Sequence, residues 1–127
     1  MAGNKGSKYY DIFLDYRLWL TKRGDGEILG HEHFMLLKKI DEGESFNYAS
    51  ESLGMSYRKA WDRIRNCEKE LGFSLVETRR GGKDGGNTTL SPDGRRLLDA
   101  YMSLRAEMDS LIKENVKKFF HKLNDEQ

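Results

Sequence analysis

Apolar residues alternate with other residues near the start of the chain. Every second position from 12 to 20 is apolar, which places one face of a β-strand against a core: Ile12, Leu14, Tyr16, Leu18 and Leu20. The segment Lys22-Arg23-Gly24-Asp25-Gly26 tolerates a tight reversal, and residues 27–29 then predict a short return strand. The pattern therefore predicts a β-hairpin, either a sheet edge or a dimer contact. Residues 1–8 are small and polar and are expected to form a disordered tail.

The apolar spacing becomes helical after Gly30. It predicts helices over residues 31–42, 46–53 and 57–71, with glycine close behind each of them. Ser45 and Ser56 are suitable N-caps for the second and third helices. Two short helices joined by a glycine-containing turn are typical of a helix-turn-helix. The stripe of the third helix that is expected to face the core consists of Tyr57, Ala60, Trp61, Ile64, Cys67 and Leu71.

A second hairpin and a long helix follow. Strand-like residues at 73–80 and 88–90 flank the glycine-rich segment 81–87, and a hairpin after a helix-turn-helix is a wing. Ser91, Pro92 and Asp93 form a strong helix start for a helix running from about residue 92 to 122. The predicted fold class is α+β, mostly α: a winged helix-turn-helix with an N-terminal β-hairpin and a long C-terminal dimerisation helix, in one domain over residues 9–127.

The long helix carries an apolar seam with alternating spacings of four and three residues, the repeat of a coiled coil. A narrow seam on so long a helix has little to cover it within a small domain, so we expect a homodimer, with Asn115 as a polar residue that sets the register. The residues of this expected contact are Leu97, Tyr101, Leu104, Met108, Leu111 and Asn115. The alternative is a helix that packs against its own domain, because four further residues widen the apolar face: Ile112, Val116, Phe119 and Phe120.

Charge is distributed unevenly, although the net charge is only +1. Residues 56–96 hold ten lysines and arginines against six acids, a local charge of +4, and the remaining residues carry −3. The outer face of the third predicted helix carries Arg58, Lys59, Asp62, Arg63 and Asn66. Arginine and lysine suit guanine and phosphate, and asparagine suits adenine, so this face predicts binding of duplex DNA. The alternative is a solvated face with pairs such as Arg58 with Asp62.

Roles in DNA binding can be assigned by position. Arg58, Lys59 and Arg63 are expected to contact the groove or phosphates, and Ser56 and Tyr57 to meet the DNA backbone at the helix start. The wing residues expected to grip flanking phosphates are Arg79, Arg80 and Lys83.

Other chemistry is not expected. The single cysteine, Cys67, cannot form an internal disulfide and has no accompanying catalytic base arrangement, so an enzyme is not predicted. His31 and His33 are two residues apart on a predicted helix and face apart, so no metal or other cofactor is expected. The glycine-rich segment 81–87 lacks the Gly-Lys-Ser/Thr and following helix of a nucleotide-binding loop. No apolar run suits a membrane span or a secretory leader, so a cytoplasmic location is expected.

Several segments together resemble one known family. They are Gly54-Met55-Ser56-Tyr57-Arg58-Lys59-Ala60-Trp61, Leu75-Val76-Glu77, Arg80-Gly81-Gly82-Lys83-Asp84-Gly85-Gly86 and Leu90-Ser91-Pro92-Asp93-Gly94. Over roughly residues 16–112 the chain resembles the N-terminal winged-helix domain of the molybdate-responsive transcription regulators (ModE), which is itself similar to the LysR-type DNA-binding domain. The resemblance implies a dimeric transcriptional regulator whose helix at 56–71 enters the major groove of double-stranded DNA and whose wing at 81–87 follows the DNA backbone.

The chain departs from that family in three respects. Full-length members carry C-terminal oxyanion-binding domains that sense molybdate, and these 127 residues end after the long helix, so molybdate sensing is not expected of them. Asp84 stands where the wing usually has glycine, and Ser50 replaces a small apolar residue of the second helix. The alternative function is a protein-interaction module whose long helix recruits a partner, such as a separate sensor or effector chain; the basic face favours DNA.

Overall fold

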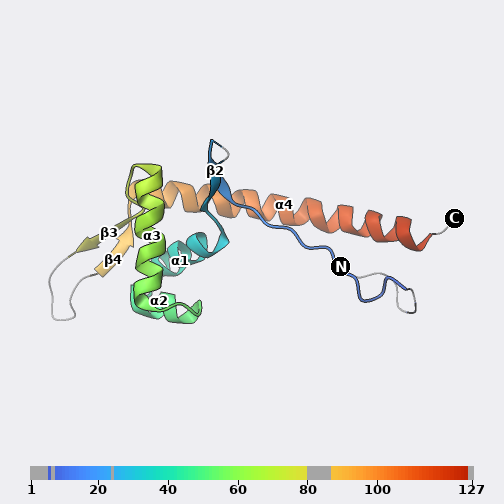
Figure 1. The fold of residues 1–127 in the computed structure, drawn as a ribbon, viewed down its shortest axis with the longest axis horizontal. Helices are drawn as coiled ribbons and strands as arrows, with labels where there is room; N and C mark the ends of the chain where they lie inside the picture. Colours follow the sequence, from blue (N-terminus) through green and yellow to red (C-terminus); the bar gives the residue numbers. More distant parts are fainter. Residues whose placement is uncertain (1–5, 7, 24, 80–86, 126–127) are drawn as a thin grey trace. The chain divides into compact units, whose positions relative to one another are not determined.

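The computed structural model describes residue 6 and residues 8–23, 25–79 and 87–125. Within these residues there are four helices and two antiparallel two-stranded sheets (Figure 1). In chain order they are β1 (Leu20–Lys22), β2 (Asp25–Leu29), α1 (His31–Asp41), α2 (Phe46–Ser52), α3 (Tyr57–Leu71), β3 (Val76–Arg79), β4 (Asn87–Leu90) and α4 (Pro92–Asn124). The predicted fold class, a mostly helical winged helix-turn-helix with a long C-terminal helix, is confirmed.

The chain forms two compact units. One unit is Leu18–Tyr101, which holds both hairpins, α1, α2, α3 and the start of α4. The other combines Met1–Arg17 with Met102–Gln127, and so includes the remainder of α4.

The first hairpin is shorter than the sequence pattern predicts. β1 covers only Leu20–Lys22, and residues 14–19 have no regular strand structure, so the predicted strand over 12–20 is wrong. β2 is five residues long and pairs with β1 from Leu20 opposite Leu29 to Lys22 opposite Asp25, so this pairing does not extend to residues 14–19. Alternation needs a covered face to enforce it, yet Ile12 and Leu14 are 47% and 37% exposed.

The first three helices begin where the sequence pattern predicts and end within one residue of the predicted positions. The hydroxyl oxygens of Ser45 and Ser56 accept hydrogen bonds of 3.1 Å from the amides of Tyr48 and Lys59. Gly72 closes α3 in the left-handed conformation, with φ of 86°. The apolar side chains that these helices bury include Phe34, Leu36, Leu37, Ile40, Phe46, Ala49, Ala60, Ile64 and Cys67.

The start of α4 is locked to the chain just before the wing. The amide of Ser91 donates to the carbonyl oxygen of Leu75 at 2.9 Å, and the hydroxyl of Ser91 donates to the carbonyl of Ser74 at 2.6 Å. The same hydroxyl oxygen caps the helix by accepting from the amide of Gly94 at 2.9 Å. Glycine is required at position 94, because a Cβ there would clash with the Leu75 carbonyl. The ring of Tyr101 then stacks on Phe34, with centroids 3.8 Å apart.

In the other unit, α4 has two distinct faces. Positions 105, 109, 116 and 120 share one face of a helix. On this face the hydroxyl of Tyr16 donates to Asp109 and the ring of Tyr16 lies 5.4 Å from the Arg105 guanidinium, while Val116 and Phe120 are buried. Positions 104, 108, 111 and 115 share a different face, on which Leu104 and Leu111 are 46% and 57% exposed.

Candidate nucleic-acid interface

The candidate interface is the outer face of α3. The opposite face of this helix is anchored, because Ala60, Ile64 and Cys67 are buried. The side chains that α3 leaves exposed include Arg58, Lys59, Asp62, Arg65 and Asn66. The structure therefore presents in solvent the mostly basic face that the charge pattern predicts.

Tyr57, the first residue of α3, does not lie in the core. The sequence pattern puts it in the inward stripe, but its side chain is 52% exposed, so that expectation is wrong. The rings of Phe46 and Trp61 stack on each other with centroids 4.0 Å apart, and Tyr57 lies outside this stack, on the lining of a cavity. Tyr57 meets the Phe46 ring edge-on at 5.7 Å. It is thus held at the surface, beside the Ser56 cap.

Arg63 is the candidate DNA-binding residue that already has a partner. It forms an ion pair with Glu32 of α1, and the two side chains are 32% and 52% exposed. A pair this accessible to solvent contributes about 0–1 kcal/mol, so exchange of Glu32 for a phosphate costs little. Arg58 and Lys59 are exposed and have no ion pair within the part of the chain that the structure describes.

The hydrogen bonds of Glu68 with Arg65 and with the start of the wing were not predicted from the sequence. The Arg65 guanidinium lies 4.8 Å from the centre of the Trp61 ring and donates to the Glu68 carboxylate at 3.3 Å. The other oxygen of this nearly buried carboxylate accepts from the amides of Leu75 and Val76, at 2.7 and 3.2 Å. Glu68 thereby ties α3 to the first strand of the wing. The spacing of Trp61, Arg65 and Glu68, four and then three residues apart, was the available signal.

The structure describes the strands of the wing but only one of the three residues expected to contact phosphates there. β3 pairs with β4 from Val76 opposite Leu90 to Arg79 opposite Asn87. Arg80 and Lys83, and with them Asp84, lie outside the described residues. The backbone of Arg79 therefore has a defined place at the end of β3, and the predicted phosphate contacts of the wing stay predictions.

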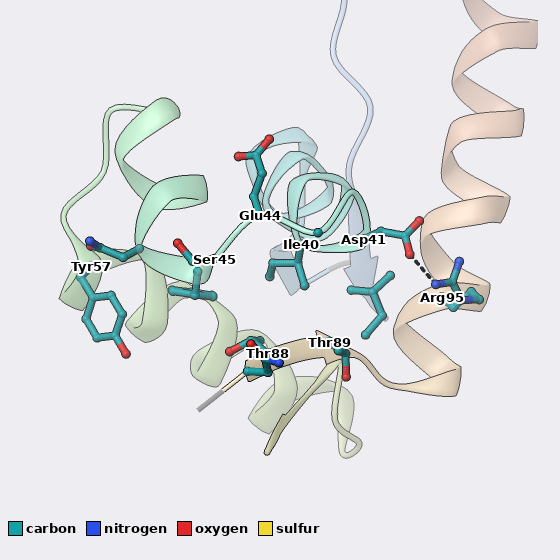
Figure 2. Close-up of a pocket in the computed structure, with 13 residues that line it drawn as sticks. Ile40, Asp41, Glu44, Ser45, Tyr57, Thr88, Thr89 and Arg95 are labelled. Atoms are coloured by element: carbon teal, nitrogen blue, oxygen red, sulfur yellow. Dashed lines mark hydrogen bonds and ion pairs between the residues drawn. The ribbon is translucent and has the colours of Figure 1, made fainter. Parts of the chain in front are cut away.

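A polar cavity of about 570 Å³ lies between the helix-turn-helix and the wing (Figure 2). The connection from α1 to α2 lines one side of it, with Ser45 among its residues, and β4 lines another with Thr88 and Thr89. Tyr57 belongs to its lining, and Asp41 extends to an ion pair with Arg95 of α4. The lining therefore includes residues of both the helix-turn-helix and the wing, the two elements with which winged-helix proteins contact DNA.

Cys67 and the potential metal ligands have a defined setting in the described residues. Burial, with Glu68 nearby, raises the pKa of the Cys67 thiol to about 12, which disfavours the reactive thiolate. No group of three or more His, Cys, Asp or Glu side chains that could hold a metal ion occurs in the described ranges. None of the helices found there is both long and apolar enough to span a membrane.

A capped helix with a basic outer face, preceded by a short helix and followed by a hairpin, defines a winged helix-turn-helix of the DNA-binding kind. Residues 31–95, about half of the chain, match the family described as bacterial regulatory helix-turn-helix protein, lysR family. The chain therefore belongs to the LysR-type family of bacterial regulatory helix-turn-helix proteins.

Individual relatives are also similar to the chain. It is 33% identical over 87 residues to the molybdenum-pterin-binding protein MopB of Rhodobacter capsulatus, covering 68% of the chain and 32% of that protein. It is 35% identical over 91 residues to the transcriptional regulator ModE of Haemophilus influenzae, covering 72% of the chain and 32% of the relative. The DNA-binding transcriptional dual regulator ModE of Escherichia coli K12 is 38% identical over 66 residues, 52% of the chain and 25% of that regulator. The resemblance to ModE is confirmed, and the chain spans about a third of these relatives or less.

Proposed function

We propose that the chain binds double-stranded DNA in a sequence-specific manner and regulates transcription. The observation that carries this proposal is α3: its inner face is fixed in the core and its outer face presents exposed basic and amide side chains. Two relatives described as transcriptional regulators add support. The proposal implies a non-enzymatic protein that acts in the cytoplasm, where bacterial DNA lies.

Residues near the start of α3 are assigned separate roles. Arg58 has an exposed side chain without an ion pair in the described ranges, so it is free to read guanine in the major groove. Lys59 lies on that face and Arg63 lies beside it, and both supply phosphate contacts, Arg63 by exchanging Glu32 for a phosphate. Tyr57, held at the surface by Phe46, meets the DNA backbone with its hydroxyl.

Dimer formation is the second part of the proposal. In the unit that contains residues 102–127, Leu104, Met108 and Leu111 share the face of α4 that the Tyr16 contact does not use. Pairing two such faces buries apolar side chains and holds two recognition helices for two half-sites. Tyr101 contributes differently from the sequence expectation, since its ring packs on Phe34 of its own chain. Asn115 donates to the Leu111 carbonyl at 2.8 Å and is exposed in the single chain.

The molybdenum-related names of the relatives are not carried over to this chain. The matched region is about a third or less of each of those proteins. The protein-interaction module is the less favoured function, because two of the relatives are described as transcriptional regulators.

The proposal is tested by selecting duplexes from a randomised library with the purified chain and with Arg58→Ala. The chain is expected to enrich a site with two half-sites about 34 Å apart, or a multiple of that spacing. Arg58→Ala is expected to cost about 1–3 kcal/mol on that site and to relax the preference at one position of each half-site. Lys113→Ala, an exposed lysine of α4, is the matched control and should bind as the unaltered chain does. Failure of the chain to enrich any sequence contradicts the proposal.

The dimer is tested with one substitution on the exposed apolar face. Leu111→Lys should reduce the mass measured by light scattering from that of a dimer toward that of one 14.8 kDa chain. Glu114→Lys introduces the same side chain at another exposed position of α4 and should leave the mass unchanged. A chain that is monomeric before any substitution contradicts this part of the proposal and leaves the DNA-binding part to the selection experiment.

A further inference from the structure

Asp62 is an acid at the centre of an otherwise basic recognition face. It follows Arg58 by four residues and precedes Asn66 by four, so all three project from the same side of α3. The buried side chains Ala60, Ile64 and Cys67 occupy the opposite side. Any double helix that approaches the face formed by Arg58 and Asn66 therefore also approaches the carboxylate of Asp62.

The carboxylate of Asp62 is exposed and has no ion pair or hydrogen bond among the residues that the structure describes. The pairing of Arg58 with Asp62 that the sequence permits is not formed. The neighbouring arginines are directed to other acids: Arg63 pairs with Glu32 and Arg65 pairs with Glu68. Within the described ranges, the Asp62 carboxylate is thus left available to accept hydrogen bonds.

The Asp62 carboxylate is not expected to bind phosphates, because a carboxylate and a phosphate repel each other. Base edges in the major groove are more selective. Cytosine presents an amino donor there, adenine presents a donor beside the N7 acceptor, and guanine presents two acceptors. An ionised carboxylate only accepts hydrogen bonds, so it is matched by cytosine, matched less well by adenine and repelled by guanine.

We propose that Asp62 reads a cytosine in the major groove and rejects guanine at the same position of each half-site. This inference rests on the proposed DNA-binding function and adds to it a residue that selects sequence without strengthening general attraction to DNA. Arg58 and Asp62, one helical turn apart, then read neighbouring base pairs with opposite hydrogen-bonding requirements: acceptors for the arginine and a donor for the aspartate.

The test compares the sites selected from a randomised duplex library by the chain, by Asp62→Asn and by Asp62→Ala. Asparagine has almost the same shape but carries a donor as well as an acceptor, so Asp62→Asn should shift the preference from cytosine toward adenine at one position of each half-site. Asp62→Ala should lose the preference there. On the unaltered chain's best site, replacing that cytosine with guanine should weaken binding by about tenfold, and both variants should reduce this difference to about twofold or less.

A matched control removes the same charge from the same helix. Glu70→Gln alters an exposed acid near the C-terminal end of α3 and should leave every base preference unchanged. Affinity for random duplex at low salt should stay equal or rise in both Asp62 variants, because an acid has been removed from the face.

The outcomes separate the two claims. If all variants select the same sequence as the unaltered chain, Asp62 does not read a base and the inference fails, while the DNA-binding function stands. A gain in affinity for all sequences with no change of preference reduces Asp62 to a repulsive charge and also overturns the inference. If the unaltered chain selects no sequence, the proposed function fails and the inference fails with it.

Discussion

The link between α3 and the wing through Glu68 gives the most direct stability prediction. Replacing Glu68 with alanine removes the acceptor from the amides of Leu75 and Val76, which lie 2.7 and 3.2 Å from one carboxylate oxygen. Both residues are buried, with exposures of 0% and 5%, so water does not readily replace the lost acceptor. A buried amide without an acceptor costs about 1–3 kcal/mol. The bond from Arg65 is solvent-accessible and adds little.

Glu68→Ala is therefore expected to lower the free energy of unfolding by about 3 kcal/mol, a large part of the roughly 5–15 kcal/mol typical of a folded domain. Glu68→Gln keeps an oxygen for the two amides and loses only the exposed bond from Arg65, so a loss of less than about 1 kcal/mol is expected. Urea unfolding followed by circular dichroism measures both values, and the midpoint of Glu68→Ala should fall by roughly 1–2 M.

The matched control is Glu70→Ala, which truncates an exposed glutamate on the same helix and should change stability by less than about 0.5 kcal/mol. A Glu68→Ala protein as stable as this control would refute the reasoning. Equal losses from Glu68→Gln and Glu68→Ala would show that the negative charge matters, rather than the acceptor for the two amides.

Three further predictions concern buried groups. Burial, with Arg63 as the next cause, lowers the pKa of His33 below 6.5, so on acidification the unfolded chain binds the proton first, and the free energy of unfolding should be highest above about pH 6.5 and fall as the pH drops below it. His33→Asn should remove this pH dependence, and the exposed His121→Gln should keep it. A His33→Asn protein with the same pH dependence as the unaltered chain would refute the assignment. Gly94→Ala should destabilise the protein by about 1–3 kcal/mol in urea unfolding because its Cβ meets the Leu75 carbonyl, and a gain in stability would contradict that contact. Cys67, with its pKa raised to about 12, should resist iodoacetamide at pH 8 until urea unfolds the chain; rapid alkylation of the folded protein would argue against its burial.

The helix boundaries were predictable because local chemistry determines them. Ser45, Ser56 and Ser91 each cap the helix that follows, and their hydroxyl oxygens accept from an amide three residues later. Gly72 adopts the left-handed conformation that ends a helix. These interactions lie within a few residues of each other, so a single sequence contains all the information needed to place them.

The features that sequence reasoning missed depend on residues far apart in the chain. Alternation at 12–20 predicts a strand, but strand formation requires a partner, and β2 pairs only with Leu20–Lys22. Tyr57 lies at the surface beside the stack of Phe46 on Trp61, two residues on different helices. Sequence spacing alone does not show which of several apolar residues will fill a shared space.

The outer face of α3 was predictable in composition but only partly in its interactions. Helical periodicity correctly placed Arg58, Lys59 and Asp62 in solvent. It did not show that Glu32 from another helix binds Arg63, since that pair spans 31 residues of sequence. The free state of the Asp62 carboxylate, on which the inference about cytosine depends, is visible only once these longer-range pairs are known.

Salt-dependent binding to duplex DNA tests the central claim most directly. The purified chain is titrated with a random duplex across salt concentrations, and its mass is measured by light scattering in the same buffer. We expect a dimer whose binding weakens linearly with salt on a logarithmic plot, with a slope that falls by roughly one phosphate contact per chain in Lys59→Ala. A folded chain that fails to bind duplex DNA even at low salt would contradict it.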